Sequence, residues 1–189
     1  MNQNSNLENF IVHYKNVLSD EECKSILKSS TEWRHHPWYS TRLRDNVDEA
    51  TDHIDPQVCF LDASNETSSI LKIRDTINHY CELNDTNVRE FTALRCNKYV
   101  EGKGMRKHFD HITSIFHHQE NCGIPILSLI IGLNSDYEGG ELTFWDTFKV
   151  KTQTGDIVVW PSCFLYPHQV LPVTKGTRYT AVTLSLIHI

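Results

Sequence analysis

The second half of the chain consists of short segments rich in β-branched and aromatic residues, each followed by a turn sequence. The segments are Phe91–Tyr99, Ile126–Leu133, Glu141–Trp145, Asp156–Trp160 and Arg178–Ile187. Glycine-rich or polar stretches, such as 101–104, 134–140 and 153–155, separate them. Many short strands divided by frequent turns are typical of a β-sandwich or a jelly roll.

The first half carries the signals of two helices. After a short strand predicted over Phe10–Val17, Ser19 opens an acidic run that suits the amino-terminus of a helix. Leu18 is placed to act as a hydrophobic staple, and a second helix is predicted over Thr67–Leu83. The apolar residues of the first helix recur at i, i+3 and i+4: Cys23, Ile26 and Leu27. Helices first and strands afterwards predict an α+β, mainly β fold, a double-stranded β-helix (jelly roll) with N-terminal supporting helices.

The length of 189 residues fits one domain. Hydrophobic residues make up 39% and charged residues 22% of the chain, a balance found in globular proteins. Residues 1–9 are predicted to be a flexible leader. Residues 10–189 are predicted to form a single domain, with a catalytic core over about 91–189.

Charge and hydropathy exclude two classes of partner. The formal net charge is −6, and the chain lacks the clustered Lys and Arg that bind a phosphate backbone, so nucleic acid is not expected. The longest apolar run, Ile124–Leu133, is about half of the roughly 20 residues that span a bilayer, so no membrane is expected. Six irregularly spaced cysteines and a polar start predict reduced thiols and a cytoplasmic location.

The motif His108-Phe109-Asp110 is the first candidate for chemistry. Residues i and i+2 of a strand point to the same face, so the imidazole and the carboxylate can reach one metal ion. Two His and one carboxylate on one face of an octahedron are the ligands of non-haem Fe(II) oxygenases. With eleven His in the chain, an H-x-D motif alone is weak evidence. His111 is the competing ligand, but it is expected to point to the other face.

His168 and Arg178 complete the candidate site. A turn at Gly176 reverses the chain, so that Arg178 begins a strand returning past His168. Apolar strand residues flank Arg178, which favours an inward-facing guanidinium with a ligand over a solvated edge residue. A guanidinium suits the distal carboxylate of a dicarboxylic acid.

From about Leu94 to Leu186 the chain resembles the prolyl 4-hydroxylase-like Fe(II)/2-oxoglutarate-dependent dioxygenases. A Tyr and a Gly precede H-x-D in that family, as Tyr99 and Gly102 do here. The strand ending in Leu-Asn and the Gly-Gly-Glu-Leu-x-Phe motif match Leu133-Asn134 and 139–144, and a Gly-aliphatic strand matches 154–159. The closing H-x-x-x-P-V-x-x-G-x-K/R motif matches these residues in order and spacing: His168, Pro172, Val173, Gly176 and Arg178.

The resemblance implies a set of roles. His108, Asp110 and His168 would bind Fe(II), and Arg178 would hold the co-substrate 2-oxoglutarate, with O2 as the second co-substrate and ascorbate as a reductant. All four residues are expected to be catalytic. Some relatives place a Tyr just before Leu-Asn to bind 2-oxoglutarate, but this chain has Ile131 and Gly132 there. Tyr99 and Thr180 are the candidates for the second contact.

The implied reaction is hydroxylation of a C–H bond with release of succinate and CO2. The expected substrate is a prolyl or other side chain in a protein or peptide, and the alternative is a free amino acid or small metabolite. A non-catalytic sensor module is a further alternative, which the complete ligand set disfavours. Demethylation of alkylated nucleobases is disfavoured because that family has a second Arg where this chain has Leu184. The irregular stretch 33–57 is a candidate for substrate capture. The sequence does not indicate the oligomeric state.

Overall fold

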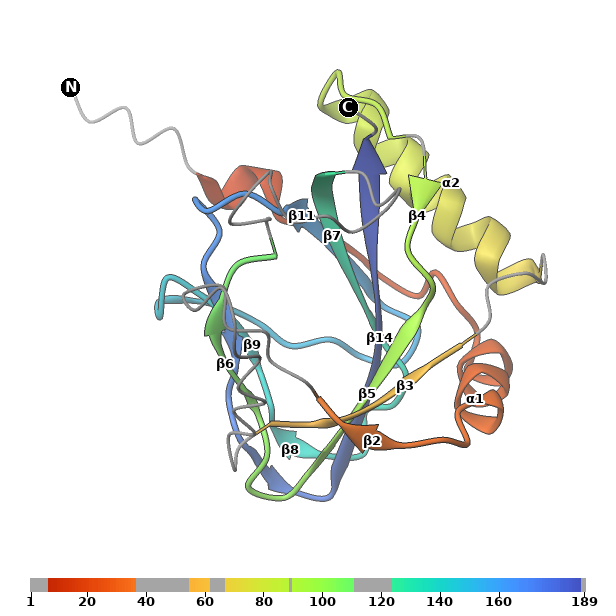
Figure 1. Ribbon diagram of the computed structural model, residues 1–189, viewed down its shortest axis with the longest axis vertical. Helices are drawn as coiled ribbons and strands as arrows, with labels where there is room; N and C mark the ends of the chain where they lie inside the picture. The colour runs from red at the N-terminus through yellow and green to blue at the C-terminus, as the bar shows by residue number, and fades with distance from the viewer. Residues whose placement is uncertain (1–6, 37–54, 62–66, 89, 111–123, 188–189) are drawn as a thin grey trace, which may run out of the picture.

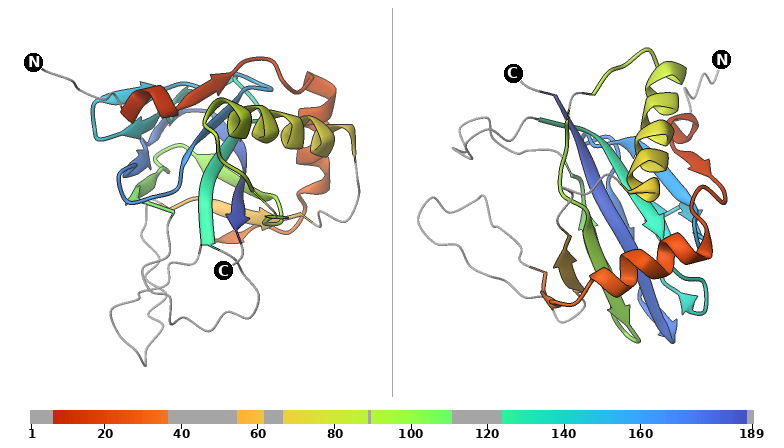
Figure 2. Two further views of the ribbon diagram at one scale, coloured as in Figure 1. Left: turned by 90° about the horizontal axis from the view of Figure 1, so that it is seen from above. Right: turned by 90° about the vertical axis from the view of Figure 1, so that its right-hand side faces the viewer.

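The computed structural model describes residues 7–36, 55–61, 67–88, 90–110 and 124–187. The strands of these residues form two layers, with two helices on the outer side of the larger one (Figures 1 and 2). This arrangement confirms the predicted mainly β fold with N-terminal supporting helices. Neither of these two helices has the length and apolarity needed to cross a membrane.

The larger layer is an eight-stranded sheet in the order β1-β11-β7-β14-β5-β3-β2, with β4 also paired to β14. Its pairs are antiparallel. The strands are β1 (Val12–Tyr14), β2 (Arg34–His35), β3 (Gln57–Phe60), β4 (Glu90–Phe91), β5 (Arg95–Val100), β7 (Ile124–Gly132), β11 (Ile157–Pro161) and β14 (Thr177–Ile187).

The smaller layer is a four-stranded antiparallel sheet in the order β10-β9-β12-β6. Its strands are β6 (Met105–His108), β9 (Leu142–Phe144), β10 (Phe148–Val150) and β12 (His168–Val170). A separate pair joins β8 (Glu138–Gly139) to β13 (Val173–Lys175). Side chains of the two opposed layers pack against each other in a second core.

The helices begin where local capping signals predict. Helix α1 (Asp20–Ser29) has Ser19 as its N-cap, and Ser19 and Glu22 form a reciprocal capping box. Helix α2 (Ser68–Leu83) is capped by the side chain of Thr67. A short 3-10 helix, η1 (Leu7–Phe10), overlaps the predicted leader, and the Tyr166 hydroxyl donates to the Leu7 carbonyl. Residues 1–6 of that leader lie outside the described residues.

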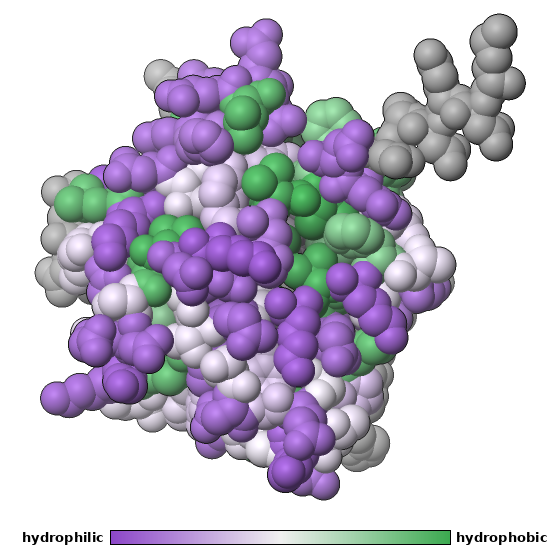
Figure 3. All heavy atoms as spheres, turned by 180° about the vertical axis from the view of Figure 1, so that it is seen from behind, coloured by the Kyte–Doolittle hydropathy of each residue, from purple (hydrophilic) through white to green (hydrophobic). Residues whose placement is uncertain are grey.

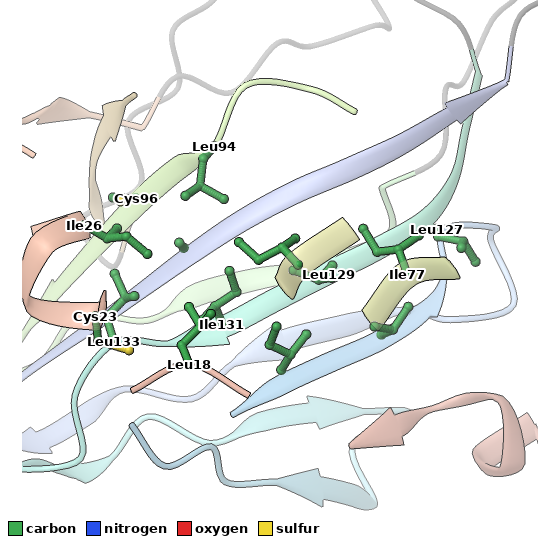
Figure 4. Packing of buried hydrophobic residues seen from close by; sticks show 14 of the residues in the cluster. Leu18, Cys23, Ile26, Ile77, Leu94, Cys96, Leu127, Leu129, Ile131 and Leu133 are labelled. Carbon is green, nitrogen blue, oxygen red and sulfur yellow. The ribbon is translucent and has the colours of Figure 1, made fainter. Parts of the chain in front are cut away.

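A hydrophobic core lies between the helices and the larger sheet (Figure 4). Leu18, Cys23 and Ile26 from α1 and its approach, and Ile77 from α2, pack on Leu129 and Ile131 of β7. A second core lies between the two sheets and includes Tyr99, Phe144 and Trp160. The surface seen from behind is mostly hydrophilic, with small hydrophobic patches (Figure 3). The cysteines of the described residues are free, as predicted, and Cys122 lies outside them.

Candidate metal centre

Three predicted ligands meet between the two sheets. His108 ends β6 and pairs in register with His168, which begins β12. Asp110 Oδ1 lies 3.5 Å from His108 Nε2, and Asp110 Oδ2 lies 3.6 Å from His168 Nε2. One ligand atom from each residue lies within 4.8 Å of the other two. The structure therefore brings together the predicted set of two imidazoles and one carboxylate.

The local geometry of the H-x-D motif differs from the prediction in one respect. His108 is the last residue of β6, and Asp110 lies two residues beyond the end of the strand. The ladder stops there because β12, the partner strand, begins at His168. Asp110 instead turns toward β7, whose Ser128 donates to it. His111, the competing ligand, lies outside the described residues.

Both imidazoles present the same nitrogen to Asp110. His108 Nδ1 lies 2.7 Å from the Arg106 carbonyl, and His168 Nδ1 lies 3.0 Å from the Tyr166 carbonyl. A carbonyl only accepts, so each Nδ1 carries a proton, and in a neutral imidazole Nε2 is then the nitrogen with the free lone pair. Hydrogen bonds of this kind orient histidine ligands and fix their tautomer.

Asp110 is fixed by a chain of two buried hydroxyls. Ser128 Oγ donates to Asp110 Oδ2 at 2.6 Å, and Ser128 Oγ lies 2.8 Å from Ser162 Oγ. Burial raises the pKa of Asp110, but the nearby imidazoles and the Ser128 hydrogen bond outweigh it and hold the pKa below its usual range. The carboxylate is therefore ionised and ready to bind a cation.

His168 stands against an aromatic wall. Its ring lies 5.1 Å from the Trp160 ring, centroid to centroid, in a T-shaped contact, and 5.6 Å from the Phe144 ring. Burial lowers the pKa of His168 to about 4, against the opposing effect of Asp110. The imidazole is neutral near pH 7, the state in which it binds a metal.

Arg178 lies deep in the same space. The residue is 1% exposed, yet its Nε and Nη1 have no hydrogen-bond partner. Its guanidinium carbon lies 5.1 Å from the centre of the Tyr99 ring and 6.0 Å from that of Tyr137. Gly140 has φ +67°, and a Cβ there would meet Arg178 Cδ at 2.8 Å. Gly140 thus leaves space for the buried Arg178 side chain, whose two unpaired donors can bind an anion.

Tyr99 and Thr180 line the space beside Arg178. Tyr99 pairs in register with Arg178, and Thr180 pairs with Asn97 on the same two strands. Both predicted residues are fully buried, and Asn97 Nδ2 donates to Thr180 Oγ1 at 3.4 Å. Burial raises the pKa of Tyr99, so its hydroxyl remains protonated and able to donate. The Tyr99 ring contacts the Arg178 guanidinium, and Thr180 is two residues along β14 from Arg178 on the same face.

The residues present fit the group that the ligand set implies. Two neutral imidazole nitrogens and one carboxylate are the donors of a non-haem Fe(II) site. The two buried nitrogens of Arg178 that lack a partner, Nε and Nη1, fit the distal carboxylate of 2-oxoglutarate. The donor chemistry therefore agrees with both halves of an Fe(II) and 2-oxoglutarate site.

Sequence reasoning missed several residues of the site. Ser128 is a polar residue inside an apolar strand, and that interruption was the available signal. Ser162 follows β11 with no comparable signal. Tyr137 flanks Arg178, but it precedes the Gly-Gly turn and no periodicity marks it. Trp33, the first residue of the stretch predicted for substrate capture, packs on Tyr179 at 6.0 Å between ring centres, and residues 37–54 lie outside the described part of the chain.

Comparison with known proteins agrees with this geometry. Residues 94–184 match the model of the 2OG-Fe(II) oxygenase superfamily. A PKHD-type hydroxylase of Cupriavidus pinatubonensis is 38% identical over 87 residues, which are 43% of this chain and 37% of that protein. A PKHD-type hydroxylase of Psychrobacter is 26% identical over 178 residues, 92% of this chain and 68% of that protein. The resemblance predicted from the sequence is confirmed.

The fold also matches a solved structure. The viral collagen prolyl hydroxylase of Paramecium Bursaria Chlorella virus-1, solved with 2OG, has a TM-score of 0.68 and 16% identity, covering 94% of this chain and 96% of that one. This likeness confirms the fold. The chain spans little more than a third of the Cupriavidus relative's length, 37%.

Proposed function

We propose that this chain, whose residues 94–184 form a 2OG-Fe(II) oxygenase region, is an Fe(II)- and 2-oxoglutarate-dependent dioxygenase. It would hydroxylate a C–H bond and release succinate and CO2, using O2. The observation that carries the proposal is the buried guanidinium of Arg178, whose Nε and Nη1 have no hydrogen-bond partner, between the same two sheets as the three ligand side chains. A site for the metal alone would not need that cation.

His108, Asp110 and His168 would hold the iron, which when bound supplies the activation of O2. The protein's own task is to keep three ligands on one side of the ion and leave the other side open. The carbonyls of Arg106 and Tyr166 hold the two imidazoles in the ligating tautomer. Ser128 holds the carboxylate, so the site is organised before the metal arrives.

Arg178 would bind the distal carboxylate of 2-oxoglutarate. Its free Nε and Nη1 supply donors, and exclusion of water strengthens the ion pair. Tyr99 and Thr180 are the proposed neighbours that complete the hydrogen bonds to the co-substrate. Ascorbate is the proposed reductant. A cytoplasmic location is also proposed, because the cysteines of the described residues are unpaired.

The proposed substrate is a prolyl or other side chain in a protein or peptide. The viral structure similar to this chain is named a collagen prolyl hydroxylase, and the sequence relatives are named PKHD-type hydroxylases. A free amino acid or small metabolite is the alternative. The complete ligand set disfavours a non-catalytic module on the same fold.

The test is turnover with a varied set of proline-containing peptides, Fe(II), 2-oxoglutarate and O2. We expect the peptides to stimulate succinate formation and to gain the mass of one oxygen atom. His168→Ala, which removes a ligand, is the control and should do neither. Stimulation by free amino acids but not by peptides would contradict the peptide substrate and favour the alternative.

A further inference from the structure

A second guanidinium faces the space between the sheets. Arg95, Asn97 and Tyr99 alternate along β5 and therefore share a face. Tyr99 belongs to the core between the two sheets, whereas Cys96 belongs to the core beneath the helices. Arg95 is thus on the metal side of the larger sheet. It pairs in register with Val182, four residues along β14 from Arg178.

Arg95 has one hydrogen-bond partner among the described residues, and this partner is not an anion. Its Nη1 donates to His36 Nε2 at 3.0 Å, while its Nε is buried without a partner. Burial and the Arg95 charge lower the pKa of His36 to about 3, so this imidazole is neutral and can accept. No carboxylate of the described residues lies within ion-pair distance of Arg95. Arg95 is partly exposed, and a cation with one donor buried and unpartnered is stabilised when an anion binds it.

Arg95 lies between Asp110 and strand β3, which is next to the edge strand β2 of the larger sheet. Asp110 is near enough to stabilise the charged form of Arg95 and oppose the fall of its pKa on burial. On the other side, Phe60 of β3 pairs in register with Arg95 and is 49% exposed. Arg34 covers the Phe60 ring at 4.9 Å. The guanidinium therefore lies between Asp110 and the exposed Phe60 of β3.

The guanidinium groups of Arg178 and Arg95 are too far apart to bind one carboxylate together. Arg178 pairs with Tyr99, and Arg95 pairs with Val182. Four residues along the strands therefore separate the two arginines, which is about 13 Å of backbone. If the proposed function holds, 2-oxoglutarate occupies the metal and Arg178 through its two ends. Arg95 is then left for the other substrate.

We propose that Arg95 binds a carboxylate of the primary substrate, which places an anionic group next to the carbon that is hydroxylated. This inference rests on the proposed function and names its substrate class. In a peptide, the carboxylate would be the carboxy-terminus or an acidic neighbour of the target residue. In a free amino acid, it would be the α-carboxylate.

Matched pairs of probes test the inference. The pairs are Ala-Ala-Pro and its amide, an amidated Ala-Pro-Glu and its Gln counterpart, and L-proline and prolinamide. Binding to the anaerobic Fe(II) and 2-oxoglutarate complex is followed by the rise in Tm, and turnover by succinate. We expect at least one acid to half-saturate at a concentration about tenfold or more below that of its neutral partner, the range for a hydrogen bond to a charged group. The pair that shows it identifies the source of the carboxylate.

Substitutions assign the preference to Arg95. Arg95→Gln should abolish the difference between acid and neutral probes, Arg95→Lys should keep part of it, and Arg34→Leu on the exposed side of Phe60 should leave it intact. Equal affinity for acid and neutral probes in all three pairs would overturn the inference. A raised 2-oxoglutarate requirement in Arg95→Gln, with the acid preference kept, would also overturn it. Failure of the wild-type chain to bind Fe(II) or 2-oxoglutarate before any probe is added would instead overturn the proposed function, and this inference with it.

Discussion

The hydroxyl of Ser128 donates to the carboxylate of Asp110 at 2.6 Å, linking the larger sheet to a ligand that follows the edge of the smaller one. Ser128 is fully buried and its oxygen also contacts Ser162. The metal centre is therefore held by both layers of the fold. Its affinity for iron should depend on a residue that does not touch the ion.

Ser128→Ala tests this dependence. Loss of the hydroxyl leaves Asp110 Oδ2 without its donor, and loss of such outer contacts costs roughly 10- to 100-fold in metal affinity. Competition with a chromophoric chelator under anaerobic conditions measures the Fe(II) dissociation constant. Ser135→Ala, at an exposed serine, is the control and should bind as the wild type does. Equal affinities for all three proteins would show that Ser128 does not organise the ligand.

Alanine substitutions at Gly140 and Gly102 test whether Arg178 binds 2-oxoglutarate. Gly140 and Gly102 both have positive φ, +67° and +80°, so alanine strains the backbone at either site. A Cβ at Gly140 would meet Arg178 Cδ at 2.8 Å, whereas a Cβ at Gly102 would meet nothing within 4 Å. We expect Gly140→Ala, but not Gly102→Ala, to raise the 2-oxoglutarate concentration needed for half-saturation. Arg178→Ala should raise it more strongly. Iron binding should be kept in all three variants. Unchanged dependence in Arg178→Ala would move the clamp to another residue.

The neutral His36 predicts a pH dependence of stability. Its pKa is about 3 in the folded chain, against an ordinary value of 6.5, because of burial and the Arg95 charge. Between these values the unfolded chain binds the additional proton. The free energy of unfolding should therefore fall as pH decreases from 6.5 toward 3, by up to about 1.4 kcal/mol per pH unit.

Urea unfolding of the metal-free protein at several pH values measures this slope. His168 has a lowered pKa too and contributes with the same sign, so the test compares two proteins. His36→Gln keeps an acceptor for Arg95 but does not titrate, and its stability should change less with pH. Identical slopes for wild type and variant would contradict a neutral, buried His36.

Local signals predicted the helices and most of the long strands. The capping box at Ser19 forms because its partner, Glu22, is three residues away on the same turn. The Ile126–Leu133 prediction corresponds to β7, a long apolar strand with neighbours on both sides. In these cases the information lies within one segment of the chain.

Sheet edges and cross-layer contacts could not be predicted in the same way. Strands β2 and β3 fall at the edge of the larger sheet, and β2 has only two residues, both exposed. Strand β2 lies inside the stretch predicted as irregular, 33–57, and β3 begins at its last residue. Neither strand was predicted, because strand pairing depends on partners far away in the sequence. The Ser128 contact with Asp110, and the position of Arg95 near it, depend likewise on how the layers meet.

Anaerobic addition of Fe(II) and 2-oxoglutarate tests the central claim most directly. We expect a weak visible charge-transfer band in the wild-type protein, because the iron that His108, Asp110 and His168 would hold would also bind the co-substrate. His108→Ala should abolish the band, since it removes one of the three ligands. Absence of the band in the wild type, with neither ligand bound, would contradict the assignment of this chain as an Fe(II) and 2-oxoglutarate enzyme.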